Sequence, residues 1–264
     1  MIEVQRLSKT FFRGTAQETV ALRDLSLSIP QGEWVTVIGS NGAGKSTLLK
    51  LIAGVIRSDS GNVSVCGRNV TYQPDYKRSK LIGRLDQDPL ASTAPTLSVE
   101  QNLAMAMLRK RGRWFRRAVS PARRETIRAK VEELGMGLES RLQAQVGTLS
   151  GGQRQALAMI MATIAEPAAL LLDEHIAALD PRASVAVMEI SQRLVRSLDL
   201  TTLMVTHNMQ FALQYGDRLI VMHRGRIVLD LAGHDKAALD VPALVRMFHD
   251  ASGDEIVSDR SLLG

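Results

Sequence analysis

Hydrophobic and polar positions follow two different periods along the chain, and each period predicts its own kind of element. Residues 2–4 and 22–29 alternate with period two, which predicts strands. After a turn at residues 30–32, the β-branched run EWVTVIG predicts a third strand that ends at a glycine-rich loop. An apolar stretch from Lys45 to about Gly54 then predicts a helix, so this region is a strand, a loop and a helix.

Helical spacing replaces this pattern from residue 98 to about residue 145, between two β-rich parts. We interpret this segment as an inserted helical subdomain. From Ala168 onward, strand-like runs (AALLL, TTLMVT, RLIVM) alternate with helical ones (SVAVMEISQRLVRSL, MQFALQY). This βαβ alternation predicts an α/β fold built on a mostly parallel sheet.

The glycine-rich loop fits the pattern G-x-x-x-x-G-K-[ST]. Its glycines let backbone N–H groups point inward, the start of the following helix adds partial positive charge, the lysine reaches the β- and γ-phosphates, and the serine hydroxyl faces Mg²⁺. The strand before it and the helix after it fit a nucleotide site. The candidate phosphate-binding residues are Gly39, Ser40, Asn41, Gly42, Ala43, Gly44, Lys45, Ser46 and Thr47.

A second motif, LLLDE, spans residues 170–174. An apolar strand that ends in two carboxylates would place Asp173 near Mg²⁺ at the carboxyl edge of the sheet, where open α/β sheets bind ligands. Glu174 is then suited to polarise an attacking water. By itself the motif could equally be a strand followed by carboxylates at a helix start, and the phosphate loop favours the catalytic interpretation.

Composition limits the number of domains and the compartments in which the chain could work. With 264 residues, 45% of them hydrophobic, the chain is expected to form one large domain or a domain with an inserted subdomain. The single cysteine, Cys66, indicates a reducing compartment, and we expect it to be buried or half-exposed. We expect neither a signal peptide nor a membrane-spanning helix.

The net charge of +6 is unevenly distributed. Residues 109–124 carry eight basic side chains and no acidic one, which leaves 25 basic against 27 acidic residues elsewhere. Such a run could contact nucleic acid or anionic lipid headgroups, or it could be a solvated surface. Trp114 and Phe115 within it favour a contact surface.

A third motif, LSGGQ, begins at Leu149 and opens an apolar helix, which makes a second anion-binding helix start. One nucleotide does not need two such helix starts from the same subunit. Together with the other motifs, LSGGQ resembles the signature of ABC ATPases. The resemblance implies that two subunits pair head to tail and that Ser150, Gly151, Gly152 and Gln153 of one close over the ATP held by the phosphate loop of the other.

Further motifs of the family follow in order. The resemblance implies that Gln87, in QDP, contacts Mg²⁺ or water and senses a membrane partner, that Asp180, in AALDP, contacts the opposite subunit, and that His207, in VTHNM, holds the γ-phosphate. Phe11 would stack on adenine, with Phe12 as a possible substitute.

The resemblance extends from residue 1 to about residue 248. It implies a P-loop NTPase of the ABC type with an antiparallel β subdomain, in which residues 1–97 and 147–264 form the nucleotide-binding core and residues 98–146 the helical subdomain of a single domain. Departures at Asp86, Ala156, Met161 and Ile176 concern the coupling surface and the packing of the helical subdomain, and none removes a ligand of ATP or Mg²⁺.

The segments DEHIAALDP and GRIVLDLAGHDKAAL are similar to those in ATPase subunits of bacterial importers of amino acids, often of the tryptophan or tyrosine type. This similarity implies a homodimer with two competent sites, on the cytoplasmic face of the inner membrane, bound to a separate permease and served by an extracytoplasmic solute-binding protein. An exporter ATPase is the main alternative. A soluble ABC ATPase acting on nucleic acid is disfavoured, because such proteins carry long coiled-coil insertions or two ATPase units. The sequence does not reveal the substrate.

Overall fold

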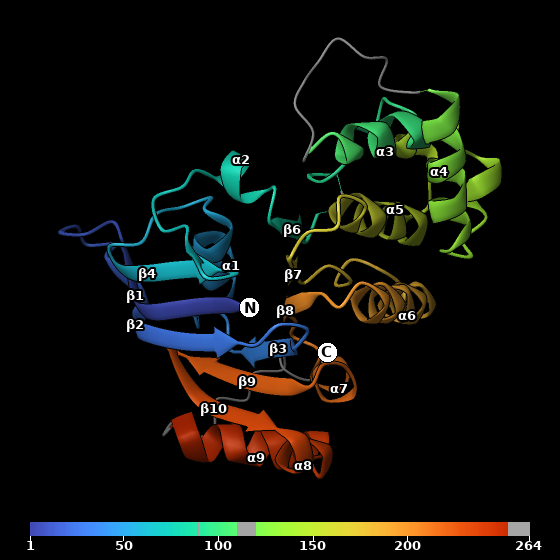
Figure 1. Cartoon of the computed structure of the whole chain (residues 1–264). Coiled ribbons are helices and arrows are strands. Elements are labelled where there is room, and N and C mark those ends of the chain that lie inside the picture. The colour runs from blue at the N-terminus through green and yellow to red at the C-terminus, as the bar shows by residue number, and fades with distance from the viewer. Residues whose placement is uncertain (89, 110–119, 253–264) are drawn as a thin grey trace.

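The computed structural model describes residues 1–88, 90–109 and 120–252. Two sheets and a group of helices make up this part of the chain (Figure 1). Most of the basic run at residues 109–124 lies outside the described residues, as do Trp114 and Phe115.

The smaller sheet is antiparallel and has the strand order β2-β1-β4-β5. In β1, Val4 lies opposite Leu27 of β2 on one side and Val63 of β4 on the other. These three side chains are buried, so the period-two pattern marks the face that packs on the core. The expected antiparallel β subdomain is thereby confirmed. Its strands are β1 (Ile2–Phe11), β2 (Thr19–Ile29), β4 (Ser60–Val65) and β5 (Arg68–Asn69).

The larger sheet has the order β10-β9-β3-β8-β7-β6. Every residue of β3 and β8 is buried, because central parallel strands are covered on both faces. The sheet is parallel as expected except at one edge, where β10 returns antiparallel to β9. Its strands are β3 (Trp34–Gly39), β6 (Ile82–Leu85), β7 (Ala169–Asp173), β8 (Thr201–Val205), β9 (Arg218–His223) and β10 (Arg226–Ala232).

Helix α1 (Lys45–Ala53) joins the two sheets, because its buried leucines belong to one hydrophobic cluster with residues of both. The short helix α2 (Asp75–Arg78) precedes β6. On the other side of the larger sheet lie α6 (Pro181–Ser197) and α7 (Met209–Gln214), and α8 (Gly233–Ala237) and α9 (Val241–Ser252) pack on β10. The order of these elements confirms the α/β expectation.

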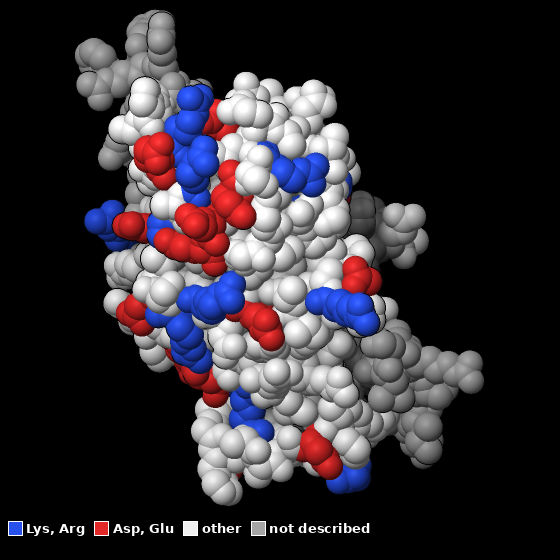
Figure 2. Space-filling view, turned by 90° about the vertical axis from the view of Figure 1, so that its right-hand side faces the viewer, with Lys and Arg blue, Asp and Glu red and all other residues white. Residues whose placement is uncertain are grey.

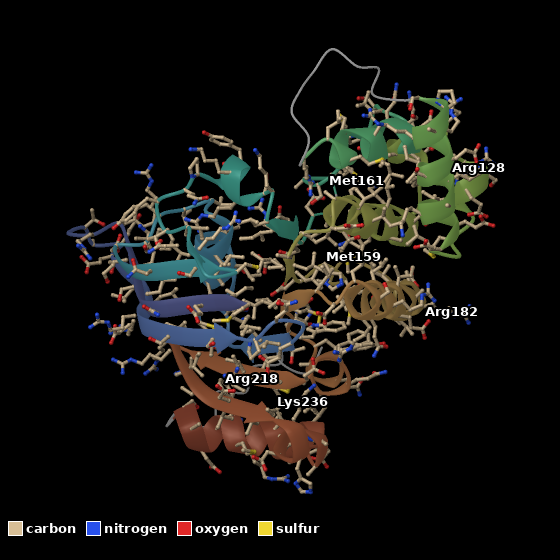
Figure 3. All side chains as sticks on the ribbon, viewed as in Figure 1. Arg128, Met159, Met161, Arg182, Arg218 and Lys236 are labelled. Carbon is tan, nitrogen blue, oxygen red and sulfur yellow. The ribbon has the colours of Figure 1, made fainter. Side chains whose placement is uncertain are left out.

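Helices α3 (Val99–Met107), α4 (Pro121–Glu132) and α5 (Gly151–Thr163) gather at the upper right of Figure 1. Helix α5 belongs to two hydrophobic clusters. Met161 is part of the cluster of α3 and α4, whereas Met159 packs with β7 and α6, and the two side chains leave opposite sides of the helix (Figure 3). The segment 98–146 therefore completes its core with a helix that lies outside that range.

Two expectations about single features have clear outcomes. Cys66 is exposed in a turn with a φ of 51°, so the expectation of a buried or half-exposed cysteine was wrong. No helix among the described residues is both long enough and apolar enough to cross a membrane.

Candidate functional site

The phosphate loop connects β3 to α1, as expected from the sequence. Gly44 caps α1 with a φ of 98°, and a Cβ there would lie 2.3 Å from the carbonyl oxygen of Ala21. Gly42 has a φ of 78°, and a Cβ added there would have no other atom within 4 Å. The two glycines therefore combine a backbone conformation that other residues rarely adopt with room for a ligand beside the loop.

Lys45, the first residue of α1, folds back along this loop. Its Nζ donates hydrogen bonds to the carbonyl oxygens of Gly39, at 2.6 Å, and Ser40, at 3.0 Å. Burial lowers the pKa of Lys45, and the carboxylates of Glu174 and Asp173 oppose that shift. A buried ammonium over a loop of N–H groups is suited to bind phosphate oxygens.

A pocket of about 270 Å³ lies over the loop and extends to the end of β1. Phe11 lines the pocket, and the Nζ of Lys9 lies 5.6 Å from the centroid of its ring. Phe12 is 64% exposed and is not among the residues that line the pocket, so the geometry favours Phe11 as the stacking residue. Thr19 and Ala21 of β2 also line the pocket, and no sequence pattern had marked them.

The two oxygen donors expected for Mg²⁺ lie together. Ser46 Oγ donates to Asp173 Oδ1 at 3.0 Å, although the two residues are far apart in sequence. Burial raises the pKa of Asp173, and the hydrogen bond from Ser46 partly offsets that rise. A hydroxyl and one carboxylate fit Mg²⁺, which commonly takes few protein ligands and completes its shell with water and phosphate oxygens. Among the described residues there is no cluster of three acidic, histidine or cysteine side chains that could hold a metal alone.

Glu174 and His207 form a pair at the same edge of the sheet, with Oε2 and Nδ1 3.4 Å apart. The hydrogen bond between them lowers the pKa of Glu174 and raises the pKa of His207. Glu174 has a φ of 47°, which is rare for a residue with a side chain, and its N–H donates to the Val205 carbonyl at 2.9 Å. Glu174 lines the phosphate-loop pocket and, with His207, a second pocket of about 510 Å³ beside α6 and α7.

Gln87 and Asp180 are both exposed. Gln87 follows β6, whose last residue, Leu85, pairs with Leu172 of β7, so it leaves the sheet at the edge that holds Asp173. The Asp180 carboxylate accepts hydrogen bonds from the backbone N–H groups of Arg182 and Ala183 and thus caps α6. Both residues lie on the surface, where a partner could contact them.

The signature motif begins α5 and is held in place by its own side chains. Ser150 Oγ accepts from the Gln153 N–H and Gln153 Oε1 accepts from the Ser150 N–H, each at 3.3 Å. Ser150 and Gly151 are exposed, and none of the described residues that line the phosphate-loop pocket comes from this motif. Within one chain, the structure does not bring the signature to the phosphate loop.

A groove of about 330 Å³ lies between α2 and α5, beside β6. Its floor holds an ion pair between Arg84 and Asp86 at 2.8 Å. Tyr76 of α2, which is 65% exposed, and Met161 of α5 line the groove, as does Arg109. Asp86 and Met161, two departures from the family pattern, thus face the same groove.

Sequence reasoning missed two buried polar side chains near the site. Arg78 is 2% exposed and donates to four backbone carbonyls around the end of α1. His175, next to Glu174, is also 2% exposed, and burial lowers its pKa to about 4. The only signal in the sequence was the histidine in DEHIAALDP, where the family more often has proline.

Comparisons with known proteins agree with this geometry. Residues 22–177 match the model of the ABC transporter family. The chain is 40% identical over 251 residues to the tyrosine transport ATP-binding protein of Clostridioides difficile, covering 95% of this chain and 100% of that protein. It is 35% identical over 268 residues to the phosphonates import ATP-binding protein PhnC of Paraburkholderia xenovorans, covering 98% of this chain and 85% of that protein.

Solved structures extend the comparison to the fold. A dimeric ATP-binding cassette in a post-hydrolysis state, bound to ADP and Pi, aligns with a TM-score of 0.76 and 25% identity, covering 88% of this chain and 98% of that one. An ATP-binding cassette in its ADP conformation aligns with a TM-score of 0.77 and 25% identity, covering 94% and 98%. The chain therefore belongs to the ABC transporter family, as an ATP-binding cassette ATPase.

Proposed function

We propose that the chain is the ATP-hydrolysing subunit of a bacterial importer for an amino acid or a similar small solute. The observation that carries this proposal is the 40% identity, over 95% of the chain, to a tyrosine transport ATP-binding protein. Phosphonate and molybdate/tungstate import subunits among the other relatives support import over export. These relatives take chemically different solutes, so similarity across the family does not define the substrate.

The residues of one chain supply one half of the proposed catalytic site. Phe11 stacks on the adenine, the loop from Gly39 to Thr47 wraps the phosphates, and Lys45 balances charge that develops on the γ-phosphoryl oxygens. Glu174 accepts a proton from the attacking water, and His207 holds the γ-phosphate and orients that carboxylate. Mg²⁺, when bound by Ser46, Asp173 and Gln87, supplies additional positive charge beside the phosphates.

The other half comes from a second copy. The N-terminus of α5, with Ser150, Gly151, Gly152 and Gln153, is separate from the pocket of its own chain, and Ser150 and Gly151 are exposed. A helix start carries partial positive charge and free N–H groups, so it would close over the γ-phosphate held by the partner. Asp180 lies at the neighbouring start of α6 and would contact the same partner. The dimeric cassette among the structural relatives supports this arrangement.

The groove between α2 and α5 supports a contact with a permease. It lies directly beyond β6, so Gln87, two residues after that strand, connects it to the nucleotide edge of the sheet. Exposed Tyr76 gives the groove an apolar rim, which suits a protein partner. We place the subunit at the cytoplasmic face of the membrane through this contact. An extracytoplasmic binding protein would then deliver the solute. Residues 1–97 and 147–264 act as the core, and residues 98–146 as the coupling subdomain.

A nucleic-acid function has less support. On the face shown in Figure 2, the described Lys and Arg side chains are interspersed with Asp and Glu. Proteins that bind nucleic acid commonly present a stripe of one sign. The basic segment that raised this possibility lies mostly outside the described residues.

The catalytic assignment is tested with Glu174→Gln, which keeps the size of the side chain but removes its ability to accept the proton. We expect ATP binding to persist and kcat to fall about 10²- to 10⁴-fold. Glu189→Gln, at an exposed position of α6, is the matched control and should keep the wild-type rate. A Glu174→Gln protein that hydrolyses ATP at the wild-type rate would refute the assignment.

The transport assignment is tested by tagging the chain in its host, solubilising the membranes gently and identifying the proteins that co-purify. A polytopic permease with an extracytoplasmic binding protein is the expected result. A permease without any binding protein would favour export, and only soluble or nucleic-acid partners would refute transport.

A further inference from the structure

The turn that carries Glu174 has a strained backbone, so contacts on both sides of it must keep that conformation. A residue with a side chain at a φ of 47° occupies a sparsely populated region that persists only where the surroundings impose it. On its N-terminal side, Glu174 is held by β8, since its N–H donates to the Val205 carbonyl. On its C-terminal side, the chain enters a short turn in which the Ala177 N–H donates to the Glu174 carbonyl at 3.0 Å.

The first residue after this strained position is His175. Its side chain is 2% exposed. The next residue in the sequence, Ile176, belongs to the hydrophobic cluster of β7, α5 and α6. The only hydrogen-bond partner of the ring among the described residues is Ser191 of α6, whose Oγ is 3.4 Å from Nε2. An imidazole in an apolar interior costs free energy unless it is hydrogen-bonded. The ring therefore depends on this one contact to satisfy a polar atom.

The hydrogen bonds of Ser191 assign the tautomer. The Ser191 hydroxyl has one proton, and it donates to the Val187 carbonyl at 2.8 Å. In the contact with His175 the serine oxygen is therefore the acceptor, and Nε2 carries the proton. Nδ1 is buried and has no partner in the described part of the chain, so a proton there would be an unsatisfied donor.

From this geometry we infer that His175 is a positioning residue for Glu174: its Nε2–H bond to Ser191 anchors the catalytic turn to α6 and keeps the carboxylate directed at its water and at His207. The inference rests on the proposed role of Glu174. It explains why a histidine with an unsatisfied nitrogen stands at a position that a hydrophobic residue could fill.

Ser191→Ala tests this with little risk to folding, because alanine has the highest helix propensity and the change removes one hydroxyl. We expect kcat for ATP to fall roughly 5- to 30-fold with little change in KM. Tm should fall by only a few degrees, because the buried imidazole loses its hydrogen-bond partner while the rest of the packing is kept. Ser197→Ala is the matched control in the same helix, since its exposed hydroxyl donates to the Leu194 carbonyl, and it should leave kcat unchanged.

Variants of His175 separate positioning from simple packing. His175→Leu removes the donor and also the unsatisfied Nδ1, so we expect an unchanged or higher Tm together with a lower kcat. His175→Gln can place an amide N–H near the position of Nε2 and should restore most of the rate, whereas His175→Asn places its amide near Nδ1 and should not. Combining His175→Leu with Ser191→Ala should lower kcat no further than either change alone.

The outcomes distinguish this inference from the proposed function. If Glu174→Gln abolishes hydrolysis while Ser191→Ala and His175→Leu keep the wild-type kcat, the positioning role is refuted and the ATPase assignment stands. A loss of kcat that tracks a loss of Tm in all of these variants would make the contact merely structural and would also refute it. A wild-type chain without ATPase activity would refute the proposed function itself.

Discussion

Replacing Arg78 by methionine tests how the helix that carries Lys45 and Ser46 is anchored. The Arg78 guanidinium donates to the Leu51 and Ile52 carbonyls at the end of α1, each at 2.8 Å. It also donates to the Thr71 carbonyl at 2.8 Å and the Gln73 carbonyl at 2.9 Å. A cation at this end of a helix is favoured by the helix dipole and by carbonyls that can accept further hydrogen bonds.

The expected loss of stability follows from how deeply Arg78 is buried. Arg78 is 2% exposed, and burial lowers its pKa, with no carboxylate paired to it among the described residues. Methionine keeps much of the apolar stem but leaves the four carbonyls without these donors. Hydrogen bonds to a charged group contribute ~1.5–3 kcal/mol each, but they are not additive, and the methionine variant no longer buries a charge. We expect a net loss of about 3–5 kcal/mol, a large part of the 5–15 kcal/mol typical of a domain.

The assay is urea unfolding of the purified chain, followed by circular dichroism, with thermal unfolding in parallel. At about 2–4 °C per kcal/mol, the expected fall in Tm is roughly 6–20 °C. Arg57→Met, at an exposed position just after α1, is the control and should change the free energy of unfolding by less than about 0.5 kcal/mol. A loss below about 1 kcal/mol for Arg78→Met would show that water or a rearranged loop replaces the guanidinium, and the reasoning would be wrong.

Other predictions concern the nucleotide site. Phe11→Ala should weaken ATP binding about five- to tenfold in a fluorescence titration, as expected for loss of about 1–1.4 kcal/mol of stacking, whereas Phe12→Ala should not; equal effects would contradict the choice of Phe11. Gly44→Ala should abolish nucleotide binding, because the loop cannot keep a φ of 98° with a Cβ that meets backbone; wild-type affinity by calorimetry would refute this. The raised pKa of His207 means that its bond to Glu174 stabilises the fold fully below the ordinary pKa of 6.5 and that this stabilisation is lost as the pH rises through the raised value. The difference in Tm between wild type and His207→Gln should therefore shrink from pH 6 to pH 9, and a constant difference would exclude this linkage.

Much of the fold followed from local patterns. The helix expected from Lys45 to Gly54 is α1, which ends at Ala53 with Gly54 as its cap, and the strand that ends in Asp-Glu is β7. Family membership followed from the spacing of the motifs and is confirmed. The roles of the individual site residues and the boundaries 98–146 remain predictions, because they depend on a bound nucleotide and on partner chains.

The sequence by itself determined the order of strands and helices and the residue types that can bind phosphate, because burial periodicity, glycine conformations and helix caps act over a few neighbouring residues. Only the tertiary structure decided the antiparallel return of β10, the burial of Arg78 against the end of α1 and the contact of His175 with Ser191. These features depend on elements that meet in space after distant parts of the chain have packed. A polar residue in a turn looks the same in sequence whether water or a helix end surrounds it, so its surroundings become defined only when the core has formed.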